Sequence, residues 1–314
     1  MDFFERLARD LDISEQDVRG FALTAPNRYK IYRIPKRTSG SRVIAHPSRM
    51  LKAYQRLIIS YVTELLPVHS CAYAYRQGVG IKDNARVHAK SSYLLKMDLQ
   101  NFFNSINPSL FFDVVEKVGL EVADRDKWLL TKLLFWSPNK SSSGRLILSV
   151  GAPSSPLVSN FIMYPFDIRM SEYCFANGLK YTRYADDITL STNKRGCLFD
   201  LPDYIKGVLA NEYQGKLSVN ESKTVFSSKA HNRHVTGITI TNKGSLSIGR
   251  QRKRYISSLI YQFSSDQLDP DDTLHLKGLL SFAFDVEPDL RRRFEKKYTS
   301  KVIHQILTCE KGND

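Results

Sequence analysis

Two adjacent aspartates, Asp186 and Asp187, stand in the middle of the segment YTRYADDITLS, whose other residues mostly favour β-strands. A third aspartate, Asp98, ends a similar apolar run in SYLLKMDLQNFF. Aspartate is disfavoured in strands, and close carboxylates raise one another's pKa, so such a group needs compensation. If both strands belong to one antiparallel sheet, their ends bring the three carboxylates within a few ångströms of one another.

A divalent cation would supply that compensation, because Mg²⁺ prefers hard oxygen ligands and completes its octahedral shell with water and phosphate oxygens. Two such ions held about 4 Å apart catalyse in-line displacement at a phosphorus atom. We therefore predict that Asp98, Asp186 and Asp187 bind two Mg²⁺ ions. The alternative is a polar hairpin turn at the aspartate pair, although such turns favour Asn-Gly or Asp-Gly and this segment has neither.

The composition indicates a globular protein with a polyanionic partner. The 314 residues include 46 Lys and Arg against 32 Asp and Glu, a net charge of +14, which favours nucleic acid or an anionic membrane surface. The sequence shows no signal peptide and no apolar run of the ~20 residues that span a bilayer, so no membrane partner is expected. The four cysteines lie far apart without a CxxC pair, which argues against zinc and favours a reducing cytoplasm.

The elements that would position these aspartates are mixed helices and hairpins. Ser14-x-x-Asp17 approximates a capping box and predicts a helix start, and apolar residues at helical spacing predict a second helix within 50–66. Two strands are expected on either side of a basic turn at Lys36–Ser41. A hairpin is expected over 179–192, with Ala185 and Asp186 at or near its turn.

Further along the chain, a long helix is predicted after the loop GAPSSP (151–156), with two prolines near its start. Another hairpin should turn at Asn242–Gly244, and helical, very basic segments follow from Arg250 onward. The order lacks strict βαβ alternation, which predicts an α+β fold with an antiparallel sheet backed by helices.

Five strings, which follow one another along the chain in the family's order, resemble the reverse-transcriptase family. YADD looks like its Tyr-x-Asp-Asp signature, and MDLQNFF resembles the palm strand that carries its first aspartate. The remaining three are similar to the nucleotide loop, a later palm segment and the primer-gripping hairpin: GAPSSP (151–156), LSVNESKT (217–224) and HVTGITI (234–240). Two shorter strings, NARVH and VTG, are similar to those of the bacterial retron branch.

This resemblance implies an RNA-directed DNA polymerase of the retron type. It would copy a structured non-coding RNA into DNA from an internal guanosine 2′-OH, giving branched RNA–DNA (msDNA). Its partners would be that cognate RNA, its DNA product, dNTPs and an effector or toxin protein in phage defence. The alternatives are a reverse transcriptase of the group II intron or diversity-generating type, or a non-catalytic RNA-binding scaffold with the same fold.

The resemblance also implies a right-hand polymerase fold of fingers, palm and thumb, with the antiparallel sheet in the palm and a helical thumb. The fingers would span 1–92, with helices at 114–150 inserted. The palm would comprise 93–113 and 151–240, and the thumb 241–314.

On the family's pattern, the three aspartates would be the catalytic metal ligands. Phe103 would lie under the sugar and exclude a ribose 2′-OH. The alternative is a core aromatic, and one of the two neighbours Phe102 and Phe103 is expected to belong to the core. Gly151 would belong to the loop beneath the incoming nucleotide. The family commonly has Gln just before this glycine, whereas this chain has Val150, which offers no hydrogen bond.

Basic residues would hold the phosphates. Arg42 would pair with the triphosphate, helped by Lys36 or Arg37, because arginine suits bidentate phosphate contacts. Lys223 would orient or protonate the leaving pyrophosphate. The alternatives are a solvated basic turn for the first group and a surface lysine for Lys223.

Overall fold

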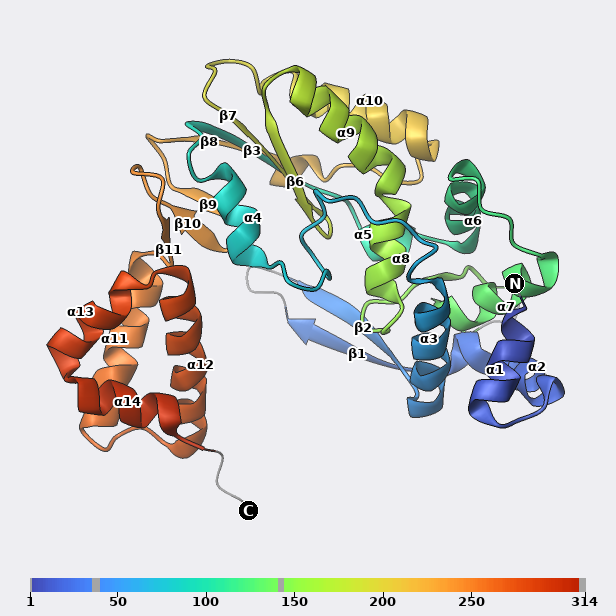
Figure 1. Ribbon diagram of the computed structural model, residues 1–314, viewed down its shortest axis with the longest axis horizontal. Coiled ribbons are helices and arrows are strands. Elements are labelled where there is room, and N and C mark those ends of the chain that lie inside the picture. The colour runs from blue at the N-terminus through green and yellow to red at the C-terminus, as the bar shows by residue number, and fades with distance from the viewer. Residues whose placement is uncertain (1, 36–39, 141–143, 311–314) are drawn as a thin grey trace. The chain divides into compact units, whose positions relative to one another are not determined.

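The computed structural model describes residues 2–35, 40–140 and 144–310 (Figure 1). Its contacts divide the chain into two compact units. Both units combine helices with antiparallel strands, which confirms the predicted α+β class. The boundaries of fingers, palm and thumb stay a prediction. The first unit contains Met1–Gln77, Lys96–Leu190 and Gly196–Val225, and the second contains Gly78–Leu95, Ser191–Arg195 and Phe226–Asp314.

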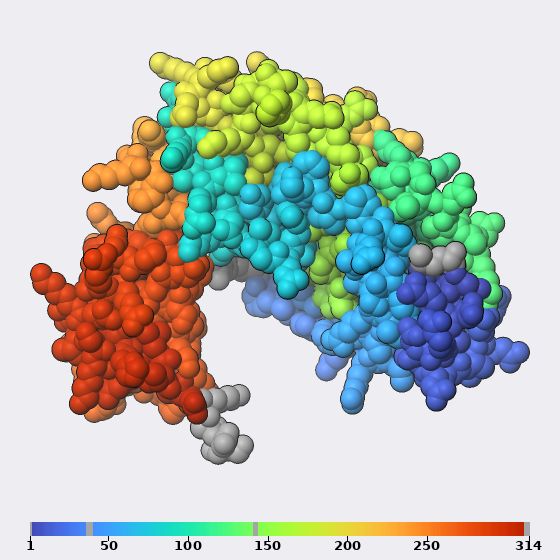
Figure 2. Space-filling model, viewed as in Figure 1, coloured from blue at the N-terminus to red at the C-terminus, as the bar shows by residue number. Residues whose placement is uncertain are grey.

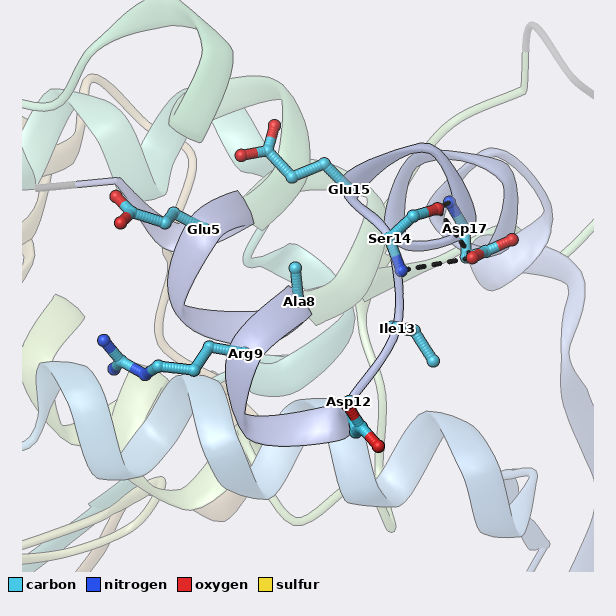
Figure 3. A pocket seen from close by; sticks show the side chains of 8 residues that line it. All are labelled: Glu5, Ala8, Arg9, Asp12, Ile13, Ser14, Glu15 and Asp17. Carbon is cyan, nitrogen blue, oxygen red and sulfur yellow. Dashed lines mark hydrogen bonds between the residues drawn. The ribbon is translucent and has the colours of Figure 1, made fainter.

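Three helices pack together in the first unit: α1 (Phe3–Leu11), α2 (Glu15–Thr24) and α7 (Asp124–Leu134). The predicted capping box is confirmed at the start of α2. The Ser14 hydroxyl accepts the Asp17 N–H at 3.1 Å, and the Asp17 carboxylate accepts the Ser14 N–H at 3.2 Å. Figure 3 shows this cap beside a shallow hollow that Glu5, Asp12 and Glu15 also line. The cap therefore sets where α2 begins.

A hairpin and an amphipathic helix follow in the chain. The two predicted strands are present: β1 (Tyr29–Pro35) and β2 (Ser41–Pro47) pair antiparallel, with Tyr29 opposite Pro47. Lys36 and Arg37 lie outside the described residues. Helix α3 (Arg49–Val62) starts at Ser48, whose hydroxyl accepts the Leu51 N–H at 3.3 Å. Its apolar face is buried, which confirms the helix predicted from the spacing of apolar residues.

The strands that carry the three aspartates belong to one sheet, in the order β6–β7–β3–β8 (Figure 1). The residues Ala185 and Asp186 connect β6 to its neighbour β7, which confirms the predicted hairpin. Strand β3 lies on the other side of β7, so the sheet order alone brings Asp98 to the same region. The bounds are β3 (Tyr93–Asp98), β6 (Lys180–Tyr184), β7 (Asp187–Thr192) and β8 (Val225–Ser228).

The single long helix predicted after GAPSSP is wrong, because two helices occupy that segment. Helix α8 (Ser155–Ile162) ends at Met163, and α9 (Tyr164–Ala176) begins there, with Pro165 in its first turn. Proline has no N–H to continue the hydrogen bonds of α8, so a new helix starts at this point. Other elements of the first unit are α5 (Phe102–Ser105), α6 (Pro108–Lys117), α10 (Leu201–Tyr213), the short 3₁₀ helices Ala25–Asn27 and Glu221–Lys223, and the paired β4 (Phe135–Trp136) and β5 (Ile147–Leu148).

The second unit joins a small sheet to five helices around one hydrophobic core. The hairpin predicted at Asn242–Gly244 is confirmed by the pairing of Ile240 with Leu246, and the helical segment begins at Arg250 as expected. The elements are α4 (Ile81–His88), β9 (Arg233–Val235), β10 (Ile238–Ile240), β11 (Leu246–Ser247), α11 (Arg250–Ser264), α12 (Pro270–Val286), α13 (Asp289–Tyr298) and α14 (Ser300–Thr308).

An additional turn, at Thr236–Gly237, joins β9 to β10. Both residues have positive φ, +47° for Thr236 and +79° for Gly237, and a threonine rarely adopts this conformation. The Thr236 hydroxyl donates to the Ile81 carbonyl at 3.2 Å and accepts from the Asn84 amide at 3.5 Å. The strings NARVH and VTG therefore meet within the second unit.

Candidate active site

The three aspartates come from neighbouring strand ends. Asp98 ends β3, Asp187 begins β7, and Asp186 lies in the turn before it, where Ala185 adopts a φ of +55°. The backbone N–H of Leu99 donates to the Asp186 carbonyl at 3.0 Å. This hydrogen bond ties the end of β3 directly to the turn, so the arrangement predicted from the sequence is present in the backbone.

The carboxylates of the turn are in an unfavourable environment. The pKa of Asp186 is raised, first by loss of solvent around the carboxylate and then by the charge of Asp98. The pKa of Asp187 is raised to about 6, first by loss of solvent and then by Asp186 and Asp98. Asp187 nevertheless keeps an exposed surface, which screens part of this repulsion. A bound cation would reverse these shifts, because it favours the charged form.

A lysine already compensates Asp98. Lys223 Nζ lies 2.9 Å from each carboxylate oxygen of Asp98. Its segment is held there by the backbone, since the Asn220 N–H donates to the Asp98 carbonyl at 2.7 Å. Lys223 therefore lies beside the aspartates and contacts the carboxylate of Asp98, and its role toward the pyrophosphate stays a prediction.

The donor chemistry of the site fits Mg²⁺, whereas the side-chain arrangement is incomplete. The ends of two neighbouring strands supply three carboxylates, whose hard oxygen atoms suit this ion. The pKa values of two of them, Asp186 and Asp187, are raised. Within residues 2–35, 40–140 and 144–310, no group of three His, Cys, Asp or Glu side chains converges closely enough to hold a metal ion. Binding of Mg²⁺ would thus require Lys223 to leave Asp98 and the side chains of the turn to rotate inward.

A cavity of about 960 Å³ in the first unit brings most of the predicted site residues together. Asp98 and Asp186 line it, whereas Asp187 does not. The phosphate-binding candidate Arg42, together with Phe103, Gly151, Val150 and Lys223, also lines this cavity. Lys36 lies outside the described residues.

The two phenylalanines after β3 differ as the sequence suggested. Phe102 is 2% exposed and belongs to the core, whereas Phe103 is half-buried and lines the cavity. Their rings meet edge to face with centroids 5.4 Å apart. The core ring therefore supports the ring that faces the cavity.

Gly151 sits where a side chain would be strained and tightly packed. Its φ is +116°, and an added Cβ would lie 3.1 Å from Ile44 Cγ2 of β2. The Ala45 N–H donates to the Val150 carbonyl at 3.2 Å, and the Ser149 hydroxyl donates to the Ala45 carbonyl. The loop is thus held closely against the hairpin that carries Arg42.

One important residue of this region, Arg183, was not predicted from the sequence. It is completely buried on β6, two residues before the turn, and its Nη1 donates to the Ala185 carbonyl at 3.0 Å. Its Nε and Nη2 donate to the Asp167 carboxylate of α9 at 2.9 Å and 2.6 Å. Asn160 of α8 accepts another hydrogen bond from Nη1 at 3.2 Å. No clear signal for it was present in the sequence, because the strand KYTRY also carries Lys180 and Thr182.

Tyr181 completes this buried network. Its hydroxyl donates to Asp167 at 2.7 Å, and Asn160 donates to the Ala74 carbonyl at 2.8 Å. The network thereby connects the turn to α8, α9 and the segment at Ala74. Arg183 is a positioning residue for the turn, since it contacts the turn's backbone and not the cavity.

Within the described part of the chain, no helix is both long and apolar enough to cross a bilayer. The family model for reverse transcriptase (RNA-dependent DNA polymerase) matches residues 34–240. The retron Ec83 reverse transcriptase of Escherichia coli is 46% identical over 284 residues, covering 90% of this chain and 91% of that protein. The retron Ec86 reverse transcriptase of Escherichia coli is 30% identical over 305 residues, covering 94% and 90%.

A solved structure shares the fold at low sequence identity. Telomerase from Candida albicans, in complex with a fragment of telomeric RNA, has a TM-score of 0.50 and 13% identity, covering 88% of this chain and 59% of that one. This likeness shows the polymerase fold. Together with the match to the family model and the identity over about nine tenths of each retron protein, it shows that the chain belongs to the retron-type reverse transcriptases, which are RNA-directed DNA polymerases.

Proposed function

We propose that this polymerase copies its own structured non-coding RNA into single-stranded DNA in the cytoplasm, starting from an internal guanosine 2′-OH of that RNA. The product would be a branched RNA–DNA molecule. The identity to retron reverse transcriptases and the strings NARVH and VTG support this proposal. An effector or toxin protein that acts with the enzyme in phage defence is part of the same proposal.

We also propose the roles of the site residues. Asp98, Asp186 and Asp187 would hold two Mg²⁺ ions, which supply activation of the attacking hydroxyl and neutralisation of the leaving pyrophosphate. Arg42, with Lys36, would hold the triphosphate.

Phe103 would restrict the space at the sugar, and Gly151 would let the loop approach the nucleotide. Once released from Asp98, Lys223 could reach the pyrophosphate with its ammonium group. The fingers, palm and thumb would follow the boundaries predicted from the sequence.

The observation that carries these assignments is the composition of the cavity. Carboxylates from two strand ends, Asp98 and Asp186, share it with the cationic Arg42 and the aromatic Phe103. A nucleoside triphosphate with bound metal needs this combination, because its phosphates pair with cations and its metal ions need carboxylate ligands. A non-catalytic scaffold would have no use for it.

The test is dNTP incorporation on a primed RNA template with Mg²⁺. The double variant Asp186→Asn/Asp187→Asn should lose incorporation by several orders of magnitude while remaining folded. Asp113→Asn, at an exposed carboxylate paired with Lys216 on the same unit, is the matched control and should stay active. Incorporation that survives the double substitution would remove the metal assignment, and an inactive wild type would favour the scaffold.

The retron-specific part needs a separate experiment. Sequencing the nucleic acid that copurifies with the protein should give a DNA joined through a 2′-5′ bond to one guanosine of an RNA. A linear product, or intron RNA, would move the enzyme to the group II intron or diversity-generating type. Phage plating on cells with and without the gene would test the role in defence.

A further inference from the structure

A small cavity of about 180 Å³ lies among the helices of the first unit and shares no lining residue with the active-site cavity. Figure 2 shows three of its neighbours at the surface: α1 in dark blue, α3 in lighter blue and the segment of α6 and α7 in green. Most of the lining is apolar, which favours an apolar ligand. Five helices contribute, through residues that include Phe3 of α1, Val62 of α3, Phe111 of α6, Leu130 of α7 and Val158 of α8.

The volume of this cavity limits the size of a ligand. A cavity of about 150 Å³ lined by Leu, Ile and Phe side chains can hold one benzene molecule, whereas drug-sized ligands occupy about 300–1,000 Å³. The cavity between these helices therefore has room for one six-membered ring with a short substituent.

The rim of the cavity is held in place by the end of α6. Gly119 follows this helix with a φ of +78°, and its N–H donates to the Glu116 carbonyl at 2.9 Å. The Leu120 N–H donates to the Val115 carbonyl at 3.0 Å, and both of these residues line the cavity. A helix end closed in this way fixes the backbone that follows it. The rim is therefore preformed, which lowers the entropy cost of binding a ligand.

One buried carboxylate lies in the wall of this apolar cavity. Asp126 of α7 is 3% exposed, and its Oδ1 accepts the Phe3 N–H at 3.0 Å. Loss of solvent is the main cause that raises the pKa of this carboxyl group. The neighbouring Arg125 forms its ion pairs with Asp2 and Glu15. Since a carboxylate accepts several hydrogen bonds, Asp126 has acceptor capacity left for a ligand.

The charged groups of the lining are all acidic. Glu121 lies at the rim and is exposed, and among the described residues no Lys, Arg or His lines the cavity. An anionic ligand would be repelled by both carboxylates. A cation would instead offset the unfavourable burial of Asp126, because an opposite charge favours the ionised carboxylate.

We propose that this cavity binds a small organic cation that carries one apolar ring or branched chain and a primary ammonium group. The apolar part would contact side chains such as Phe111 and Leu130, and the ammonium group would donate a charge-assisted hydrogen bond to Asp126. Helix α8 contributes Val158 to this cavity and Ser155 to the active-site cavity. A bound cation would therefore contact the helix that begins at the nucleotide loop.

The experiment uses benzylamine, benzyl alcohol and benzoate, which share one ring and differ in charge. Ligand-observed NMR titrations at about pH 7 give the affinity of each probe for the protein. Asp126→Asn removes the charge but keeps an oxygen that can accept the Phe3 N–H. Asp124→Asn, at an exposed carboxylate of the same helix that pairs with Lys127, is the matched control. Val122→Phe places a larger side chain at the half-buried rim and tests the location.

Benzylamine should bind the wild type about tenfold more tightly than benzyl alcohol, as expected for a hydrogen bond between charged groups. Benzoate should bind about tenfold more weakly than the alcohol. In Asp126→Asn the advantage of the amine should disappear, while the affinity for the alcohol stays within about twofold of the wild type. Asp124→Asn should keep all three affinities, and Val122→Phe should weaken the amine and the alcohol by about tenfold or more.

The proposal would be overturned by benzoate binding as tightly as benzylamine, by an amine advantage that survives Asp126→Asn, or by an equal loss in Asp124→Asn. Undiminished binding in Val122→Phe would place the amine elsewhere on the protein and would also overturn it. Thermal unfolding checks that each variant is folded. If Asp126→Asn is not, the order of the three probes in the wild type and the result for Val122→Phe decide. None of these measurements uses DNA synthesis, so they test the cavity independently of the proposed function.

Discussion

Asp167→Asn should destabilise the first unit strongly, although the residue lies outside the active-site cavity. Asp167 and Arg183 are both completely buried, with a shortest contact of 2.6 Å between Arg183 Nη2 and the carboxylate. The substitution removes the counter-charge of the guanidinium group and weakens the hydrogen bond from Tyr181. Removing one partner of a buried ion pair costs about 3–5 kcal/mol, because the other charge stays buried without compensation.

Such a loss would be a large part of the roughly 5–15 kcal/mol that stabilises most folded proteins. Both tryptophans, Trp128 and Trp136, belong to the first unit, so their fluorescence during urea unfolding reports on this unit. The free energy of unfolding should fall by about 3–5 kcal/mol in Asp167→Asn. In Asp203→Asn, whose exposed carboxylate pairs with Lys206 one turn away, it should fall by less than about 0.5 kcal/mol.

A double variant separates charge from packing. Asp167→Leu/Arg183→Met replaces the ion pair by apolar side chains, and such replacements are often close to neutral, so it should be more stable than Asp167→Asn. A loss below about 1 kcal/mol in Asp167→Asn would refute this account of Arg183. So would a double variant that is no more stable than the single one.

Lys223→Met should strengthen Mn²⁺ binding to the free protein by about fivefold, because the lost ammonium–carboxylate contact contributes on the order of 1 kcal/mol; calorimetry showing weaker binding would mean that Lys223 helps to build the site. Phe103→Ala should raise ribonucleotide incorporation, whereas Phe102→Ala should lower the free energy of unfolding by about 3–5 kcal/mol; stronger loss of sugar selectivity in Phe102→Ala would reverse the two roles. The pKa of Asp187, about 6 in the folded state against 3.8 as its model value, means that the folded protein binds this proton more tightly. Without metal, its contribution to stability is therefore present below about pH 4 and is lost as the pH rises through 6. Between pH 4.5 and 7.5, the free energy of unfolding of Asp187→Asn, measured in urea, should rise relative to that of the wild type by about 1 kcal/mol, after discounting for screening by solvent. An equal pH dependence in both proteins would contradict this.

Local signals in the sequence predicted much of the fold. The cap at Ser14, the hairpin at Asp186 and the start of α11 at Arg250 all follow from short-range chemistry. The break between α8 and α9 could have been predicted from Pro165, but the prediction used only the two prolines near the start of the segment. The turn at Thr236 could not, because its positive φ depends on contacts with α4, far away in the chain.

The site shows the same division between local and distant signals. The aspartates could be located because strand ends and residue types mark them, whereas Phe103 was named only through the resemblance to the reverse-transcriptase family. The salt bridge between Lys223 and Asp98 joins residues 125 positions apart, and nothing near either residue indicates the other. Arg183 likewise gains its meaning only when α9 places Asp167 beside it. Sequence patterns thus indicate which groups are present, and packing decides which of them neutralise one another.

The meeting of NARVH with VTG has a practical consequence for engineering. Thr236 hydrogen-bonds to both Ile81 and Asn84, so the two strings form one structural joint although 152 positions separate Asn84 from Thr236. Chimaeras between retron enzymes should accordingly exchange both strings as a pair. A crossover placed between them would combine NARVH of one enzyme with VTG of another, and the two strings would then not match.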